Sequence, residues 1–163
     1  MQNSKLISYF NQEAEYRDRW RKKNWYYHAT LEKLFRFIVP EGEAVLELGS
    51  ATGDLLASLK PARGVGVDSS PRMIEIAAKK YPHIEWKVGN AAELMLGEKF
   101  TYVILSDLVG YVDDIEQLFT SLERVCSERT RVVVTYYNSL WEPVLRLAEF
   151  LHLKSRQPLQ NWL

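Results

Sequence analysis

The stretch VLELGSATGDLL, residues 45–56, runs from apolar chain into a loop of small residues and back into apolar chain. Glycine is favoured where the backbone takes positive φ or approaches a ligand closely, so Gly49 and Gly53 are the positions expected to contact a ligand if this loop binds one. In an open parallel sheet, ligands bind beyond the carboxyl ends of the strands, and the loop after the first strand lies there. The stretch is therefore either a ligand-binding loop or a tight strand-to-helix turn.

Outward from this loop, apolar strand patterns alternate with helical patterns. The helical patterns cover residues 31–38, 71–77, 115–125 and 139–151, the last of them beginning with Ser139 and Glu142 at capping-box spacing. Alternation of this kind predicts an α/β fold with a doubly wound parallel sheet. The five predicted strands are AVLEL (44–48), GVGV (64–67), IEWKV (84–88), FTYVIL (100–105) and RVVVTYY (131–137).

Length, charge and cysteine content narrow the class of protein. With 163 residues and 47% hydrophobic residues, the chain is expected to form one domain. Twenty-one basic residues balance 21 acidic ones, which disfavours a nucleic-acid partner. The one cysteine, Cys126, continues the apolar stripe of the helix predicted over 115–125, and a single cysteine suits the cytoplasm. No segment is apolar enough to predict a transmembrane helix.

A second acidic position favours a nucleoside ligand. Asp68 ends the second strand pattern 19 residues after Gly49, a spacing at which a carboxylate accepts both hydroxyls of a ribose. Ala51 and Asp54 stand where the dinucleotide fingerprint requires glycine, and the chain has no Gly-Lys-Ser/Thr triplet for a phosphate loop. Glu47 would repel a pyrophosphate and attract an ammonium group. These features predict a ribose-containing ligand that carries positive charge.

Together, three motifs after three successive strands resemble the class I S-adenosylmethionine-dependent methyltransferases, of the type 11/25-like kind. The motifs are ELGSATG (47–53), Asp68 and GNAAEL (89–94), and the resemblance covers roughly residues 43–137. It implies a Rossmann-like sheet in the order 3-2-1-4-5, with S-adenosylmethionine as cofactor and S-adenosylhomocysteine as product. It also implies an enzyme that methylates a small molecule, or a lipid or glycan precursor.

The resemblance implies a role for each cofactor residue by position. Glu47 would anchor the methionine amino end, and the backbone of 49–53 would cradle the cofactor. Asp68 would hold the ribose hydroxyls, and Asn90 would meet the adenine amino group. The full predicted set is Tyr27, Glu47, Gly49, Ser50, Ala51, Thr52, Gly53, Asp68, Ser69, Met73, Asn90, Ala91 and Ser106.

Methyl transfer from a sulfonium requires alignment of donor and acceptor and exclusion of water, so a general base is optional. Asp107, His28 and Tyr111 are the candidate catalytic residues, and no metal site is expected. The sequence SDLV (106–109) lacks the Asn/Asp-Pro-Pro-Tyr turn of relatives that methylate exocyclic amino groups. A small-molecule acceptor is therefore favoured.

Each of these polar residues also has a structural interpretation. Asp68 could cap the helix that begins at Pro71, and Asn90 could be an ordinary turn residue. Asp107 and the pair at 113–114 could be solvated loop and helix-start charges. His28 could be a surface or packing residue.

The N-terminal segment is rich in aromatic and charged residues. It is expected to form part of a lid, with Tyr26, Tyr27 or His28 pointing toward the cofactor. The basic run 17–23 is either a solvated helix face or a contact for an anionic substrate or membrane surface. The predicted division of the single domain (1–163) is a helical lid segment (1–40), a cofactor-binding core (41–137) and a final helix with tail (138–163).

Three departures from the family pattern matter. Ala51 replaces the middle glycine of the loop, and Asn90 stands where the family usually has Asp after the third strand, although its side-chain carbonyl can still bond adenine. The chain is also too short for the family's usual last two strands, which makes it look C-terminally truncated. The strand at 131–137 would then lie at an open sheet edge and could pair two copies into a homodimer. Two alternatives stay open: a non-catalytic S-adenosylmethionine-binding or regulatory module and, less favoured, a nicotinamide-dependent oxidoreductase.

Overall fold

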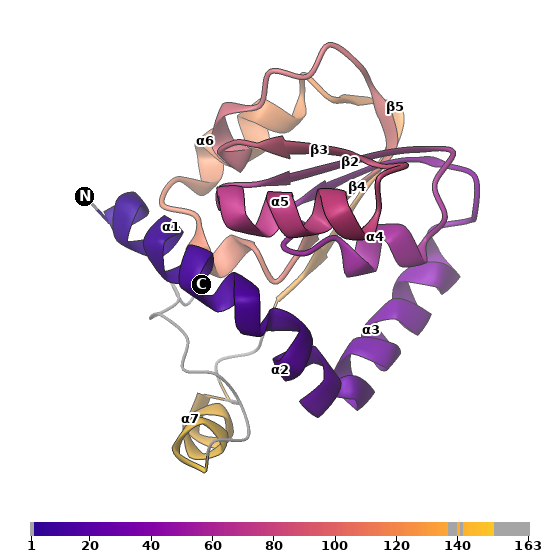
Figure 1. Cartoon of the computed structure of the whole chain (residues 1–163). Coiled ribbons are helices and arrows are strands. Elements are labelled where there is room, and N and C mark those ends of the chain that lie inside the picture. Colours follow the sequence, from indigo (N-terminus) through magenta and orange to yellow (C-terminus); the bar gives the residue numbers. More distant parts are fainter. Residues whose placement is uncertain (1, 137–139, 141, 152–163) are drawn as a thin grey trace.

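The computed structural model describes residues 2–136, 140 and 142–151. Its centre is one parallel sheet in the order β3-β2-β1-β4-β5, which confirms the predicted order (Figure 1). The registers pair Leu48 with Val67 on one side and with Leu105 on the other. The strands are β1 (Ala44–Leu48), β2 (Arg63–Asp68), β3 (Glu85–Val88), β4 (Phe100–Ser106) and β5 (Cys126–Thr135).

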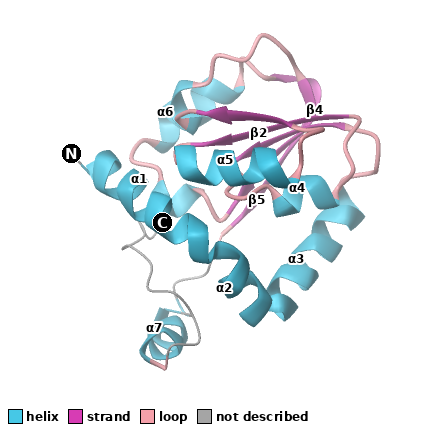
Figure 2. Cartoon of the chain, in the orientation of Figure 1, coloured by secondary structure: helices cyan, strands magenta, loops and turns pink. Residues whose placement is uncertain are grey.

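Helices cover both faces of this sheet, and short 3-10 turns occupy 14–16, 91–93 and 109–111 (Figure 2). The predicted helices at 31–38 and 71–77 are both present, although the first begins earlier, at Trp25. No helix among the described residues is long and apolar enough to cross a membrane. The helices are α1 (Gln2–Glu13), α2 (Arg17–Lys23), α3 (Trp25–Ile38), α4 (Asp54–Ser58), α5 (Pro71–Lys80), α6 (Ile115–Leu122) and α7 (Glu142–Phe150).

Alternate residues of the central strands enter two separate hydrophobic clusters. Leu46 and Leu48 of β1 pack with Leu118 of α6 on one face. Val45 packs with Phe35 of α3 on the other. Because side chains alternate along a strand, burial on both faces produces the continuous apolar pattern of β1 and β4.

The prediction for Cys126 was wrong. Helix α6 ends at Leu122, and Cys126 is the first residue of β5, paired with Phe100 and only partly buried. The apolar period suggested a longer helix because Val125, three residues after Leu122, is buried although it lies in the turn after the helix. The polar start of β5, SERT (127–130), gave no strand signal because an edge strand is solvated on several sides.

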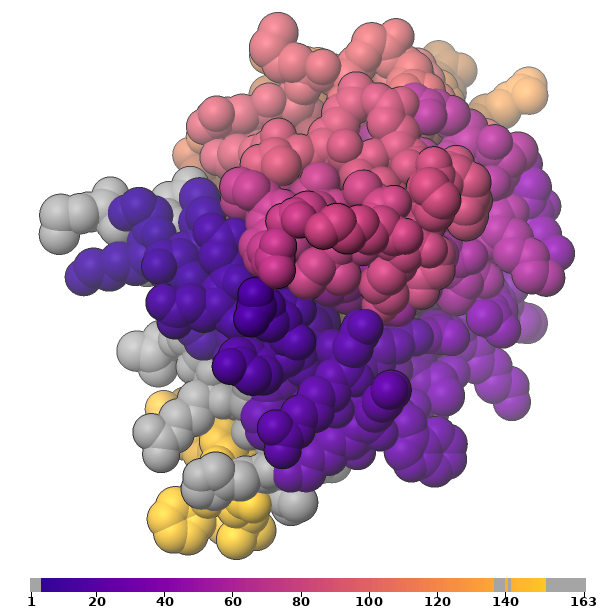
Figure 3. Space-filling view, in the orientation of Figure 1, coloured from indigo at the N-terminus to yellow at the C-terminus, as the bar shows by residue number. Residues whose placement is uncertain are grey.

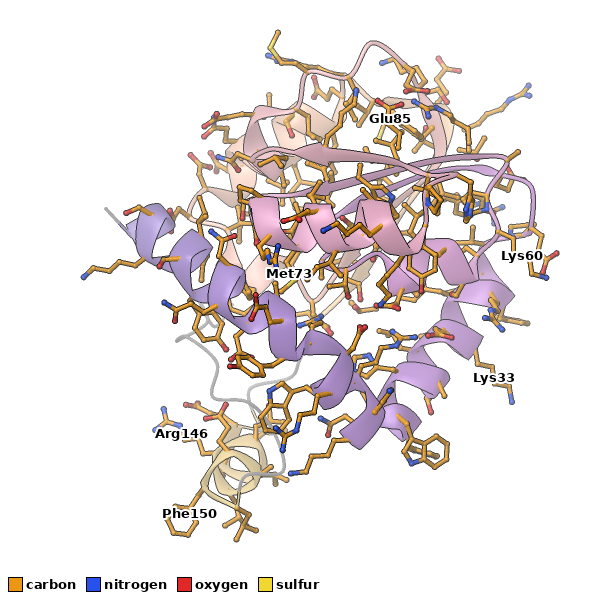
Figure 4. All side chains as sticks on the ribbon, in the orientation of Figure 1. Lys33, Lys60, Met73, Glu85, Arg146 and Phe150 are labelled. Carbon is orange, nitrogen blue, oxygen red and sulfur yellow. The ribbon has the colours of Figure 1, made fainter. Side chains whose placement is uncertain are left out.

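The C-terminal part is only partly described. Strand β5 starts five residues before its predicted start and ends at Thr135, and among the described residues it is an edge of the sheet. Helix α7 lies away from the sheet, with Phe150 pointing outward (Figure 4). The predicted helix start at Ser139 lies outside the described residues.

The N-terminal helices lie against α5 and the carboxyl ends of the strands. Figure 3 shows this segment (indigo) against the surface formed by α5. Asn11 of α1 accepts hydrogen bonds from Ser70 Oγ (2.7 Å) and from the backbone N–H of Arg72 (3.2 Å), so α1 completes the cap at the start of α5. These helices thereby form one wall of the cavity described next.

Candidate functional site

A cavity of about 620 Å³ lies between the carboxyl ends of the strands and helices α1–α3. This volume is in the range of small-molecule and cofactor sites. The structure brings every sequence-predicted site residue to its lining, from five parts of the chain. They are Tyr27 and His28 of α3, Glu47 to Gly53 except Leu48, Asp68, Ser69 and Met73 after β2, Asn90 and Ala91 after β3, and Ser106, Asp107 and Tyr111 after β4.

The loop after β1 takes a backbone conformation that presents its polar groups to the cavity. Gly49 (φ +72°), Ala51 (φ +46°) and Gly53 (φ +81°) all lie in the left-handed region. Ala51 is the position of the family's middle glycine, and its positive φ explains why glycine suits that position. The hydroxyl of Ser50 is buried without a hydrogen-bond partner among the described residues.

Close packing against Trp86 explains why residue 53 is glycine, and the sequence did not reveal this contact. A Cβ at Gly53 would lie 2.3 Å from Cη2 of Trp86, and one at Gly66 would lie 2.2 Å from Cζ3 of the same ring. Trp86 therefore packs beneath the loop, and its indole Nε1 donates to the carbonyl of Tyr81 (2.9 Å). Glycine at both positions makes room for this indole.

Glu47 is a buried carboxyl at the floor of the cavity. It is 3% exposed and accepts a hydrogen bond from the backbone N–H of Leu56 (3.1 Å). Burial raises its pKa to about 8, and Arg17 opposes this shift. Because the charge is costly here, a cationic ligand group would stabilise the ionised carboxylate.

Asp68 connects the second strand to the loop. Its Oδ2 accepts from the backbone N–H of Ala51 (2.9 Å), and its Oδ1 accepts from that of Ser70 (2.8 Å). A carboxylate has about four lone-pair sites, so capacity remains for two further donors. Burial raises its pKa. Asp68 is not the cap of α5: Ser70 is, accepting from the N–H of Met73 (3.1 Å).

Asn90 forms a turn as well as lining the cavity. Its Oδ1 accepts from the N–H of Ala92 (3.0 Å), and its Nδ2 donates to Glu93 (3.1 Å). This confirms the turn interpretation of Asn90. Asp114 likewise caps α6 through the N–H of Gln117 (2.8 Å), as expected for a helix-start charge, and also lines the cavity.

Among the candidate catalytic residues, Asp107 is joined to the N-terminal helices. The hydroxyl of Tyr27 donates to its Oδ2 (2.5 Å), and Thr135 Oγ1 donates to its Oδ1 (3.3 Å). The pKa of His28 is lowered to about 4 by burial, followed by Arg17 and Arg21. His28 is therefore neutral at pH 7, and the same surroundings disfavour its protonated form.

Sequence reasoning missed part of the N-terminal wall. Arg17 and Arg21 line the cavity, whereas the sequence left the basic run 17–23 open between a solvated face and a contact for an anionic substrate or membrane surface. Tyr26 was expected to be able to point inward, but it is 71% exposed. The residues of α2 and α3 that line the cavity recur about every three to four residues, and this helical spacing was the signal that could have identified them. The cavity-lining positions of these helices are Arg17, Trp20, Arg21, Asn24, Tyr27, His28 and Leu31.

Asp54, at the start of α4, ties this wall to the core. Its carboxylate accepts from Lys80 (2.7 Å), Tyr81 (2.8 Å) and Thr52 (2.8 Å), and these bonds lower its pKa against the effect of burial. Arg21 lies 3.9 Å away. No group of acidic, histidine or cysteine side chains among the described residues is arranged to hold a metal ion.

Known proteins share this architecture. Residues 14–163 match the family model described as "Methyltransferase domain". A demethylmenaquinone methyltransferase of Chlorobaculum parvum is 35% identical over 92 residues, which cover 52% of this chain and 38% of that protein. The protein of Chlorobaculum tepidum with the same name gives the same values. The chain thus spans less than half the length of these curated relatives.

Solved structures extend the likeness to nearly the whole chain. A methyltransferase of Thermotoga maritima, described as a possible histamine N-methyltransferase, superposes with a TM-score of 0.76 over 96% of this chain and 75% of its own, at 21% identity. DhpI bound to S-adenosylhomocysteine superposes with a TM-score of 0.69 over 81% of this chain and 67% of its own, at 20% identity. With its family match, strand order and loop motifs, the chain belongs to the class I S-adenosylmethionine-dependent methyltransferases.

Proposed function

We propose that this chain binds S-adenosylmethionine in the cavity and transfers its methyl group to a small-molecule acceptor. The observation that carries the proposal is the convergence of the positive-φ loop, Glu47, Asp68 and Asn90 on one cavity. These groups come from the carboxyl ends of three different strands, which the parallel sheet brings to one edge, and all of them line the same cavity. Their chemistry matches a ligand with an ammonium group, a ribose and a base.

The residues fit this cofactor. Glu47 supplies a buried carboxyl for the amino group. Asp68 keeps two lone-pair sites for the ribose hydroxyls, while Asn90 and Met73 border the adenine. Arg17 is the cation placed to meet the cofactor's carboxylate. The bound cofactor supplies an electrophilic methyl on a sulfonium.

Aromatic side chains of the cavity lining suit an acceptor that carries a ring. Phe10, Trp20, Tyr27 and Tyr111 line the cavity, and the rings of Phe10 and Tyr111 meet edge to face at 5.4 Å. The name of the two curated relatives, demethylmenaquinone methyltransferase, supports an acceptor of ring type. Helices α1–α3 act as a lid that excludes water from the reacting groups.

Asp107 is the proposed base for an oxygen acceptor. Its carboxylate is held by Tyr27 and Thr135, and the first of these bonds forms only while α3 lies over the strand ends. Closure of the lid therefore positions the proton acceptor at the same time. Neutral His28 and Tyr111 are the other groups placed to move a proton.

Calorimetric titration tests the cofactor assignment. We expect S-adenosylhomocysteine and S-adenosylmethionine to bind the wild-type chain in the micromolar range, with loss of binding in the Asp68→Ala variant. Binding of NADH instead would indicate the oxidoreductase alternative. Formation of S-adenosylhomocysteine with an acceptor panel then separates an enzyme from a non-catalytic binding module.

Proton release gives a sharper test of Glu47. At pH 7 a carboxyl with a pKa of about 8 is about 90% protonated, so binding an ammonium group should release nearly one proton. Titrations in phosphate and Tris, which differ in ionisation enthalpy, would report this release. 5′-Methylthioadenosine, which lacks the amino acid, is the matched control and should release none.

Strand β5 supports a proposal for self-association. It is an edge of the sheet, and Val132 and Val134 are both exposed. We propose that two copies pair through β5 into a homodimer. Light scattering after gel filtration tests this, and a Val132→Lys substitution should give monomers.

The single cysteine, Cys126, agrees with the cytoplasm as the compartment.

A further inference from the structure

Helix α3 has a second face, which points away from the cavity. Three large aromatic side chains stand on it: Trp25 is 67% exposed, Tyr26 71% and Phe37 89%. Lys33 and Arg36 lie between them, and Figure 4 shows Lys33 pointing into solvent. At 100° per residue these positions fall on one side of the helix. We call this set of five, Trp25, Tyr26, Lys33, Arg36 and Phe37, the α3 outer face.

This exposure is not a consequence of an unpacked helix. The opposite side of α3 is firmly seated, with Phe35 fully buried and Leu31 and Ile38 packed against the same cluster. The outer face extends about 18 Å along the helix from Trp25 to Phe37, at 1.5 Å per residue. Exposed aromatic side chains of this size and number require an explanation beyond packing.

The surroundings of the α3 outer face are positively charged, although the chain as a whole is neutral. Exposed Arg19, Lys22 and Lys23 of α2 adjoin its N-terminal end. No acidic side chain in the described part of the chain forms an ion pair with Arg19, Lys22 or Lys33. The nearby acids are already used: Glu32 pairs with Arg21 and Arg36, and Asp18 pairs with Lys80.

Aromatic side chains mixed with lysine and arginine favour one kind of partner. Tryptophan and tyrosine concentrate at the headgroup level of bilayers, and basic side chains are attracted to anionic lipids. Protein interfaces, by contrast, are depleted in lysine. We propose that the α3 outer face, with the exposed cations of α2, docks on a bilayer surface that carries anionic headgroups.

Docking there would place the cavity wall next to the bilayer. The inner sides of the same two helices supply Arg17, Trp20, Tyr27 and His28 to the cavity. If the proposed methyl transfer holds, the acceptor is a ring compound dissolved in the bilayer; this step rests on the proposed function. The docking itself does not, because it involves none of the cavity residues.

Vesicle sedimentation of the full chain, without cofactor or acceptor, tests the docking. We expect binding to phosphatidylcholine vesicles with about 30% phosphatidylglycerol, weak binding to phosphatidylcholine alone, and a decrease with salt. The Lys22→Glu/Lys33→Glu variant should lose about fivefold or more in partition coefficient for each lysine. A Trp25→Ala/Phe37→Ala variant should lose affinity at every salt concentration, because its contribution is apolar.

Matched controls change the same properties elsewhere. Lys79→Glu/Lys99→Glu makes an equal charge change outside the α3 outer face and outside β5, and Met95→Ala removes another strongly exposed apolar side chain. Both should bind vesicles as the wild type does, and circular dichroism and thermal unfolding should show all variants folded. Equal losses in controls and test variants, or no binding to anionic vesicles, would overturn the proposal. So would binding of a nucleic-acid duplex that depends on the same lysines without any vesicle binding.

Discussion

The buried carboxyl of Glu47 makes the stability of this fold depend on pH in a predictable direction. Its pKa is raised from 4.5 to about 8 in the folded chain, chiefly by burial. The folded state therefore binds this proton more tightly than the unfolded state, so the free energy of unfolding falls as pH rises between these two values. The Glu47→Gln substitution keeps the shape of the protonated carboxyl and the acceptor for the Leu56 N–H but cannot ionise.

The magnitude follows from the two pKa values. Between pH 6 and pH 8, ionisation of Glu47 should lower the free energy of unfolding of the wild type by about 2 kcal/mol. The Glu47→Gln variant cannot ionise at this position, so it should not show this loss. Urea denaturation of both proteins at pH 6, 7 and 8 measures the difference. Asp68 and His28, whose pKa values are also shifted, titrate in both proteins and largely cancel.

Two results would refute the reasoning. If the free energies of unfolding of the two proteins ran parallel between pH 6 and 8, Glu47 would not titrate in this range. If the wild type gained stability relative to the variant as pH rose, its carboxylate would be stabilised in the folded state, and a cationic ligand would not be needed to ionise it. Either outcome would remove the basis for proton release on cofactor binding.

The remaining predictions concern the loop and the lid. Ala51→Gly should stabilise the chain by about 0.5 kcal/mol in urea denaturation, since relief of the left-handed strain exceeds the added entropy of the unfolded state; destabilisation would contradict this. Gly53→Ala should cost about 2–3 kcal/mol because its Cβ would clash with Trp86, and a Trp86→Leu background should recover part of the loss. Tyr27→Phe should speed proteolysis within α1–α3 by about fivefold through loss of the Asp107 bond, an opening of about 1 kcal/mol; an unchanged cleavage rate would show that this bond does not hold the lid.

Local sequence signals carried much of the fold and part of the site. The glycine-bearing loop at 49–53, the acid at the end of β2 and Asn90 after β3 were all found from motifs, and all line the cavity. They could be found because each follows directly from a strand end, and parallel strands bring their carboxyl ends to one edge. The predictions of helix α5 and of a helix end before Pro40 were also correct, because each pattern is contained within one element.

Other features depended on contacts between distant segments. Trp86 packs against Gly53 and Gly66, which lie in different elements, and no pattern in the sequence near Trp86 predicts this contact. The inward direction of Arg17 depends on the angle between α2 and the sheet, and the basic run alone left a solvated face and a contact surface both open. Cys126 was misplaced because a buried turn extended the apparent helical period into an edge strand.

By itself, then, the sequence determined the order of the elements, the ligand-binding end of the sheet and the chemistry of the loop, because hydrophobic period, glycine and strand-end polar residues are properties of short segments. Only the tertiary structure decided which face of the N-terminal helices meets the cavity and which faces solvent. It also decided how far the pKa of Glu47 rises, because burial and proximity depend on how segments far apart in the chain pack against one another.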